Sequence, residues 1–172
     1  ILVVGPTYIA PLFNDYQPVP PGEVRDAVEA MAIDAGIPTD RVFMYDGSRQ
    51  SNNFTANVAG IGGAARIAIS DVALDEATLD EVKAVTGHEI GHYKLGHVWD
   101  GVFLTIVIVM ASFFIADKAF NPVARLFGAR EDIGDPTTMP VLLFLVGVIA
   151  MFTQPVSNTL SRMNETEADH YS

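Results

Sequence analysis

Residues 87–97, GHEIGHYKLGH, contain the side chains with the clearest chemical potential. On a helix, His88 and His92 would lie about 40° apart on one face, because an α-helix has about 3.6 residues per turn. Two imidazoles in this arrangement can bind one Zn²⁺ ion. Glu89 lies about 100° from His88, where it can accept a proton from a metal-bound water. The motif predicts metal-assisted hydrolysis, with Glu89 as the general base.

A third ligand should lie elsewhere, because a catalytic zinc usually has three protein ligands and one open position. The segment NTLSRMNETEAD places Asn158, Arg162, Glu165 and Asp169 along one polar stripe of a helix. Glu167 points to the other side of that helix. We expect either Glu165 or Asp169 to bind the metal and the other to orient a ligating histidine. The spacing does not distinguish the two.

The helix that carries the motif should begin at Thr78, which forms a capping box with Glu81, and run to residue 120. Glycines 87, 91 and 96 each cost a helix up to about 1 kcal/mol relative to alanine. They are therefore expected where another backbone approaches closely.

Two other histidines are expected to stay outside the metal site. On one continuous helix, His97 would lie about 180° from His88, which predicts a packed or hydrogen-bonded side chain. His170 is off the polar stripe, and we expect it to be non-catalytic.

The chain is 49% hydrophobic and only 18% charged. Residues 101–116 and 136–161 contain no charged residue, and these runs favour two membrane helices over the alternative of a buried helix pair in a soluble core. If they form an antiparallel hairpin, the chain returns to the membrane boundary it started from. The hairpin would then bring Glu165 and Asp169 back to His88 and His92.

The predicted fold is mainly α with a small β-hairpin or sheet (α+β), arranged as one membrane metalloprotease catalytic region over residues 1–172. Five segments are expected in it. They are the end of a preceding membrane segment (1–13), an amphipathic helix (21–37), a small β region (41–70), the motif helix continuing into a membrane helix (78–120) and a membrane helix with the third ligand (137–171). Residues 14–22 are expected to form a Pro-rich turn, and 60–63 the turn of a β-hairpin.

The formal net charge of -11 and the lack of a basic patch predict that the chain has no nucleic-acid partner. There are no cysteines, so any metal must be held by His, Asp or Glu.

Five segments are similar, in order, to signature segments of the CAAX prenyl protease 1 family, which are integral-membrane zinc peptidases. They are APLFNDYQPVPPGEVRDAV, DGSRQSNNFTANVAG, RIAISD, GHEIGHYKLGH and SRMNETEAD. The resemblance implies one Zn²⁺ per chain, bound by His88, His92 and Glu165, with Glu89 as general base and Asp169 behind a zinc histidine. It also implies a multi-pass protein with a cytosolic active site and further transmembrane helices before Ile1.

The expected partners are the lipid bilayer and a peptide or protein substrate, which in this family is prenylated. An extended substrate could add as a strand beside residues 53–59, with Asn57 fixing its register and Thr55 and Arg162 as further candidate contacts. Two alternatives remain open. One is an HtpX-like quality-control membrane protease, and the other is a non-catalytic membrane scaffold with a structural zinc site.

Overall fold

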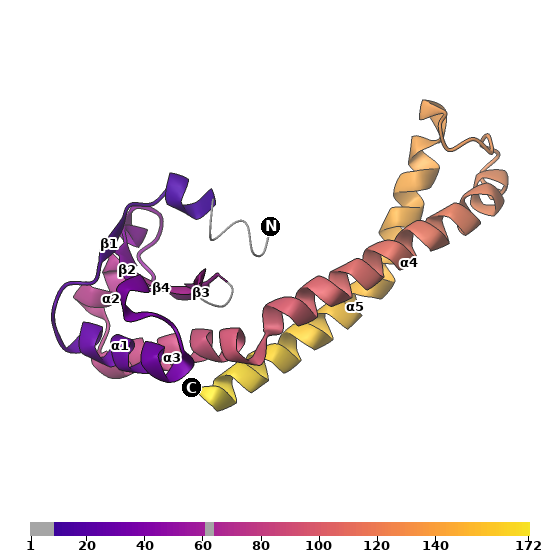
Figure 1. Cartoon of the computed structure of the whole chain (residues 1–172). Helices are drawn as coiled ribbons and strands as arrows, with labels where there is room; N and C mark the ends of the chain where they lie inside the picture. Colours follow the sequence, from indigo (N-terminus) through magenta and orange to yellow (C-terminus); the bar gives the residue numbers. More distant parts are fainter. Residues whose placement is uncertain (1–8, 61–63) are drawn as a thin grey trace. The chain divides into compact units, whose positions relative to one another are not determined.

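The structure, a computed structural model, describes residues 9–60 and 64–172 and divides the chain into two compact units (Figure 1). The first unit contains the described residues up to Val98 together with Asn164–Ser172, and the second is Trp99–Met163. Residues 1–8 of the predicted membrane segment and 61–63 of the predicted hairpin turn lie outside the described residues. Within 1–13, Ala10–Leu12 forms a short 3-10 helix.

Four strands and five α-helices make up the described chain. The strands are β1 (Tyr16–Pro18), β2 (Val42–Tyr45), β3 (Ala56–Ala59) and β4 (Arg66–Ser70). The helices are α1 (Glu23–Ala35), α2 (Asp71–Glu76), α3 (Leu79–Leu95), α4 (His97–Leu126) and α5 (Met139–Tyr171). Short 3-10 helices occur at Thr39–Arg41, Gly47–Arg49 and Pro136–Thr138.

The strands form one mixed sheet in the order β1-β2-β4-β3. β2 is parallel to β4, whereas β1 and β3 are antiparallel to their neighbours. The pairing of β3 with β4 agrees with the expected hairpin. β1 lies inside the segment for which the sequence predicts only a turn, and it is a strand because Tyr16–Pro18 pairs with β2 at the sheet edge. An edge strand tolerates Pro18, since proline lacks the N–H that a central strand needs.

The core of the first unit lies between the sheet and helices α1 and α3. Ile67 and Ile69 of β4 point to the same face and are completely buried. They share one cluster with Val28 of α1 and with Val82 and Ile90 of α3. Burying side chains of this size stabilises the fold by roughly 1.5–3 kcal/mol each. This packing fixes α3, and with it the histidine motif, against the sheet.

Helix α3 begins at the predicted capping box. The backbone N–H of Glu81 donates to the Thr78 hydroxyl at 3.3 Å, and the backbone N–H of Thr78 donates to the Glu81 carboxylate at 2.8 Å. The helix differs from the prediction at its other end, because it stops at Leu95 instead of continuing to residue 120. Gly96 has a φ of 76°, a left-handed conformation that terminates the helix. A new helix, α4, starts at His97 and extends to Leu126.

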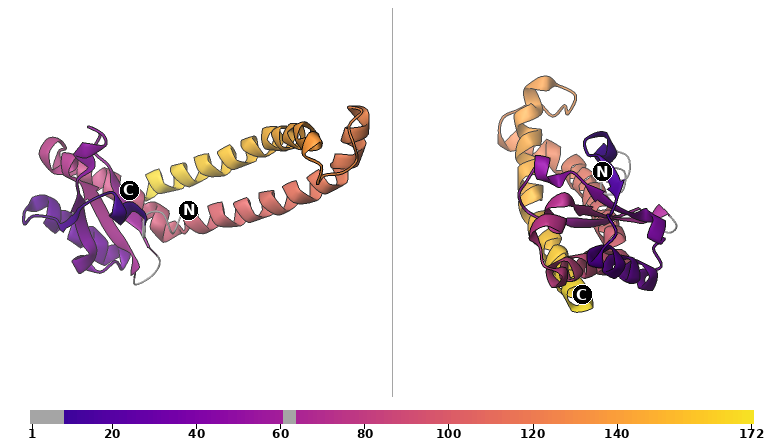
Figure 2. Two further views of the ribbon diagram at one scale, coloured as in Figure 1. Left: turned by 90° about the horizontal axis from the view of Figure 1, so that it is seen from above. Right: turned by 90° about the vertical axis from the view of Figure 1, so that its left-hand side faces the viewer.

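The second unit consists of the apolar parts of α4 and α5 and their connection (Figure 2). Both helices are long and apolar enough to span a membrane, with mean hydropathies of 2.2 and 2.0 over the most apolar windows. Hardly any of those two windows is buried within the chain, and large side chains such as Phe103, Phe113 and Phe152 are exposed. This exposure argues against the alternative of a buried helix pair in a soluble core.

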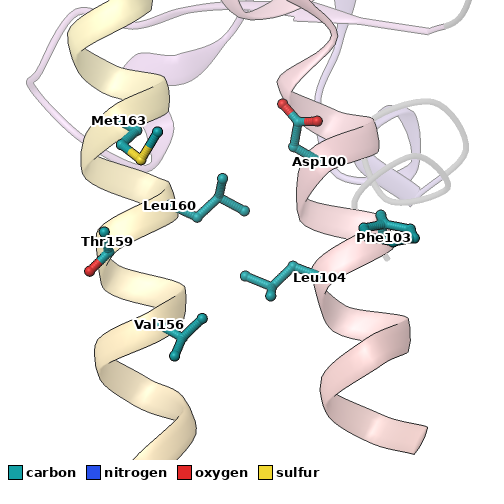
Figure 3. A pocket seen from close by; sticks show the side chains of 7 residues that line it. All are labelled: Asp100, Phe103, Leu104, Val156, Thr159, Leu160 and Met163. Carbon is teal, nitrogen blue, oxygen red and sulfur yellow. The ribbon is translucent and has the colours of Figure 1, made fainter.

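Near their connection the two helices pack together through Phe120, Ala124, Val141 and Leu145. Nearer the start of α4, the two helices line an open pocket of about 480 Å³, whose side chains are mainly apolar. Leu104 of α4 and Leu160 of α5 point toward one another across it (Figure 3). The predicted α+β fold, with a motif helix, a small sheet and two long apolar helices, is therefore confirmed.

Candidate metal centre

Helix α3 presents His88 and His92 on one face, as their spacing predicts. Both side chains are about one quarter exposed. Their rings meet edge to face with centroids 4.7 Å apart, and their Nε2 atoms are separated by 3.1 Å. Two ligands of one tetrahedral zinc ion would be separated by about 3.3 Å, given zinc–nitrogen bonds of roughly 2.0–2.1 Å. The pair is therefore close to the spacing that one ion requires.

The last turns of α5 bring Glu165 to the same place. Its Oε2 lies 3.3 Å from Nε2 of His88, and its Oε1 lies 3.7 Å from Nε2 of His92. One ligand atom from each of the three residues lies within 4.8 Å of the other two. The carboxylate is 57% exposed, so the cluster is open to solvent on that side.

Close approach of α5 to α3 depends on two of the motif glycines. A Cβ atom on Gly91 would lie 3.2 Å from Cα of Ala168 and 3.1 Å from Cβ of Tyr171. A Cβ atom on Gly87 would lie 3.2 Å from Cα of Ser172. The expectation of a close backbone is therefore confirmed at these two positions. Gly96 has a different reason, because its left-handed φ ends α3.

Asp169 lies on the opposite side of the His88 ring from Glu165. Its Oδ1 is 2.8 Å from Nδ1 of His88, within hydrogen-bonding distance. The sequence pattern did not distinguish Glu165 from Asp169, but the structure gives the two carboxylates different neighbours. Glu165 faces the Nε2 atoms of both histidines, whereas Asp169 faces the back of one.

Behind His92 lies a pair of residues whose place in the site the sequence did not reveal. Nδ1 of His92 is 2.8 Å from Nδ1 of His97, and Nε2 of His97 is 3.2 Å from Oε2 of Glu167. His97 is hydrogen-bonded and buried, in agreement with its predicted role. The prediction that the His97 side chain points away from His88 assumed one continuous helix, however. The helix break at Gly96 turns this side chain toward His92. Glu167, expected to point away from the site, meets His97 there.

Burial governs the electrostatics of the motif. It raises the pKa of Glu89, an effect that the neighbouring His88 opposes and Glu165 reinforces. Burial also lowers the pKa of His92, although Glu165 acts in the opposite direction. A lowered pKa favours the neutral imidazole, which is the form that can bind a metal.

The donor set fits a metal ion. If Nδ1–H of His88 donates to Asp169 and Nδ1–H of His92 donates to His97, neither Nε2 atom carries a proton. Two nitrogen lone pairs and the Glu165 carboxylate then converge without a hydrogen-bond donor among them. Such a group repels itself unless a cation lies at its centre. Two imidazoles and one carboxylate form a ligand set typical of catalytic zinc.

The candidate substrate residues lie in two regions. Asn57 belongs to the edge strand β3, where it pairs with Ala68 of β4. Thr55 precedes the strand, and its hydroxyl hydrogen-bonds to that of Tyr45. Arg162 is an exposed residue of the second unit. His170 is exposed near the end of α5 and is absent from the metal-ligand group found among the described residues.

Comparison with known proteins places this chain in a family. Residues 18–172 match the profile of Peptidase family M48. The chain is 33% identical to an uncharacterized metalloprotease of Bacillus subtilis, YhfN, over 99% of this chain and 41% of that protein. It is 29% identical to a CAAX prenyl protease 1 homolog of Dictyostelium discoideum, again over 99% of this chain and 41% of the relative. The chain therefore spans about two fifths of the length of these relatives.

The fold is also that of a solved protein. The crystal structure of S. mikatae Ste24p matches 99% of this chain with a TM-score of 0.80 and 24% sequence identity, and the match covers 43% of that protein. The predicted resemblance to CAAX prenyl protease 1 is confirmed by these matches. Because the family match extends from residue 18 to the last residue, the chain belongs to the metalloprotease family M48.

Proposed function

We propose that this chain is the catalytic region of a zinc-dependent membrane endopeptidase, with one Zn²⁺ held by His88, His92 and Glu165. The observation that carries the proposal is the convergence of three potential ligand atoms from α3 and α5 within 4.8 Å of one another. Family membership supports a metal-dependent hydrolase, and the ligand types favour zinc.

In this mechanism the chain supplies positioned groups and a proton carrier. When bound, zinc supplies Lewis acidity that polarises the scissile carbonyl and makes water a better nucleophile. Glu89, half-buried and next to His88, takes the proton from the attacking water and passes it to the leaving amine. Asp169 holds the His88 ring through Nδ1, which would keep Nε2 of His88 available to the metal.

The substrate adds as an extended strand along the open edge of β3. The backbone N–H of Ser70 donates to the carbonyl of Thr55 at 2.8 Å, and antiparallel pairs alternate between bonded and non-bonded. The backbone groups of Ala56 and Val58 therefore point away from β4, toward the free edge. They can bind a peptide main chain, while Asn57 between them sets the register. β3 packs against α3, the helix that carries the motif.

CAAX-type, prenylated peptides are the proposed substrates, on the basis of the named CAAX prenyl protease 1 homologs. A broader peptide specificity, as in an HtpX-like quality-control protease, is the competing function. Comparing hydrolysis of a farnesylated peptide and its unprenylated counterpart separates the two. Equal kcat/KM for both peptides would favour the broader protease.

We also propose that the two apolar helices span the bilayer in a multi-pass protein whose active site faces the cytosol. Their length, their hydropathy and the exposure of their apolar side chains support membrane insertion. Protease protection of a tag inserted in the 127–135 connection, measured in oriented vesicles, tests the orientation, because two spanning helices place this connection on the side of the bilayer opposite to the active site.

Zinc analysis together with a peptidase assay of the wild type and a Glu89→Ala variant tests the central proposal. The wild type should contain one zinc per chain and lose its activity with a chelator. Glu89→Ala should keep the zinc while its turnover falls on the order of 10²–10⁴-fold, the usual contribution of a general base. Wild-type turnover in this variant would refute the assignment of Glu89. A wild type that binds zinc without hydrolysing peptides would instead indicate a scaffold.

A further inference from the structure

We infer that His97 and Glu167 are positioning residues for the metal, acting through His92. Glu167 orients His97, and His97 in turn orients the ligand ring. This inference rests on the proposed zinc site and extends it by two residues that the sequence motif alone does not identify. Each of the two proposed ligand histidines then has a hydrogen-bond partner at Nδ1, which is a carboxylate for His88 and a second histidine for His92.

The three side chains form a continuous hydrogen-bonded chain. Nδ1 of His92 lies 2.8 Å from Nδ1 of His97, whose Nε2 lies 3.2 Å from Oε2 of Glu167. The His97 side chain is only 4% exposed, whereas that of Glu167 is 58% exposed. This hydrogen-bonded chain, called the relay below, therefore runs from the solvated carboxylate of Glu167 through the buried ring of His97 to Nδ1 of His92.

Proton counting gives the relay one direction as long as His97 carries a single ring proton. The Glu167 carboxylate can only accept, so His97 must donate to it through Nε2–H. A neutral His97 then has a bare Nδ1, which accepts the Nδ1–H of His92. His92 is left with an unprotonated Nε2, which is the atom that faces His88 and Glu165. The relay thus selects the one tautomer of His92 that can bind the ion.

The break between α3 and α4 makes this contact possible. Gly96 adopts a left-handed conformation, and His97 is the first residue of the next helix. The ring centroids of His92 and His97 are 5.0 Å apart at an interplanar angle of 74°. A buried histidine normally has hydrogen-bond partners in any role. What points to positioning is the identity of one partner, the Nδ1 atom of a proposed metal ligand.

Zinc affinity of the purified protein in detergent, measured by competition with a chelator, tests the inference. His97→Phe removes the acceptor behind His92 and should weaken zinc binding about 10–100-fold, the usual cost of losing such a partner. Glu167→Ala changes an exposed side chain and should weaken binding in the same direction but less. Glu167→Gln should recover most of that loss, because an amide oxygen accepts the same proton. His170→Ala, which removes an exposed histidine of the same helix, is the matched control.

A second readout separates positioning from folding. With Co²⁺ in place of zinc, the visible absorption bands report the ligand geometry, and they should shift in His97→Phe and Glu167→Ala but not in His170→Ala. Wild-type zinc affinity and unchanged cobalt spectra in both variants would overturn the inference while leaving the zinc site intact. A wild type that binds no zinc would overturn the proposed function and this inference together.

Discussion

The two histidines proposed as metal ligands, His88 and His92, have different surroundings at the front (Nε2) and at the back (Nδ1) of their rings. At the front, the Nε2 atoms lie close to each other and to the Glu165 carboxylate. At the back, each Nδ1 has its own support, which is the exposed Asp169 for His88 and the buried His97 for His92. We therefore expect the front to determine whether an ion is bound at all. We expect the back to determine how firmly the rings are held in the orientation that binds it.

The largest effect is expected from the front. Glu165→Ala removes one of three proposed ligands and should weaken zinc binding by more than about 100-fold, beyond the roughly 10–100-fold cost of losing an outer partner. Peptidase activity should disappear with the metal. Metal analysis after dialysis measures the loss, with Glu76→Ala, an exposed glutamate in α2, as the control. If this variant kept stoichiometric zinc, the front would not be the binding face.

A change at the back should cost less. Asp169→Ala removes the acceptor of His88 and should weaken zinc binding about 10–100-fold, while Asp169→Asn should lose less because its amide oxygen still accepts the ring N–H. Chelator competition on both variants gives the ratio. Equal losses in Asp169→Ala and Glu165→Ala would erase the proposed distinction between front and back.

The spacing of α5 and α3 can be changed without touching any ligand. Gly91→Ala adds a methyl group 3.1–3.2 Å from Tyr171 and Ala168, and overpacking of this kind costs about 1–3 kcal/mol. We expect a lower unfolding temperature and weaker zinc binding. Gly87→Ala should be milder, because only one atom, Cα of Ser172 at 3.2 Å, lies closer to the added methyl group than ordinary van der Waals contact. A more stable Gly91→Ala protein with full zinc affinity would contradict this packing.

The smallest effect is expected far from both faces. Thr78→Ala removes the side-chain cap of α3 and should destabilise the protein by about 1 kcal/mol. Zinc affinity should stay unchanged, because the cap lies at the opposite end of the helix from the break at Gly96. Thermal unfolding and chelator competition measure the two quantities separately. A large loss of zinc would show that the rings depend on the whole helix and not on their local supports.

Local patterns predicted the front of the site well. The spacing of His88 and His92 and the capping box at Thr78 depend only on helical geometry, and the structure reproduces both. The polar stripe correctly brought Glu165 and Asp169 to the site but could not rank them. Which carboxylate faces which nitrogen is set by tertiary packing at Gly87 and Gly91, which no pattern within α5 encodes.

The back of the site was harder to predict, because it depends on one backbone conformation. A continuous helix directs His97 away from His88, and only the left-handed Gly96 turns it back. A signal was present, since Gly96 follows Lys94 and Leu95 as a helix-ending glycine commonly does. Strand β1 was missed for a related reason. Its three residues carry little strand pattern of their own and are ordered by pairing with β2.

The contacts between α3 and the end of α5 join residues that are far apart along the chain, with His88 and Asp169 separated by 81 positions. An ion bound between these helices would act as a removable staple that closes the intervening loop, much as a disulfide does in other proteins. Metal should then set the melting temperature as well as the activity, and its removal should free the carboxyl-terminal turns of α5.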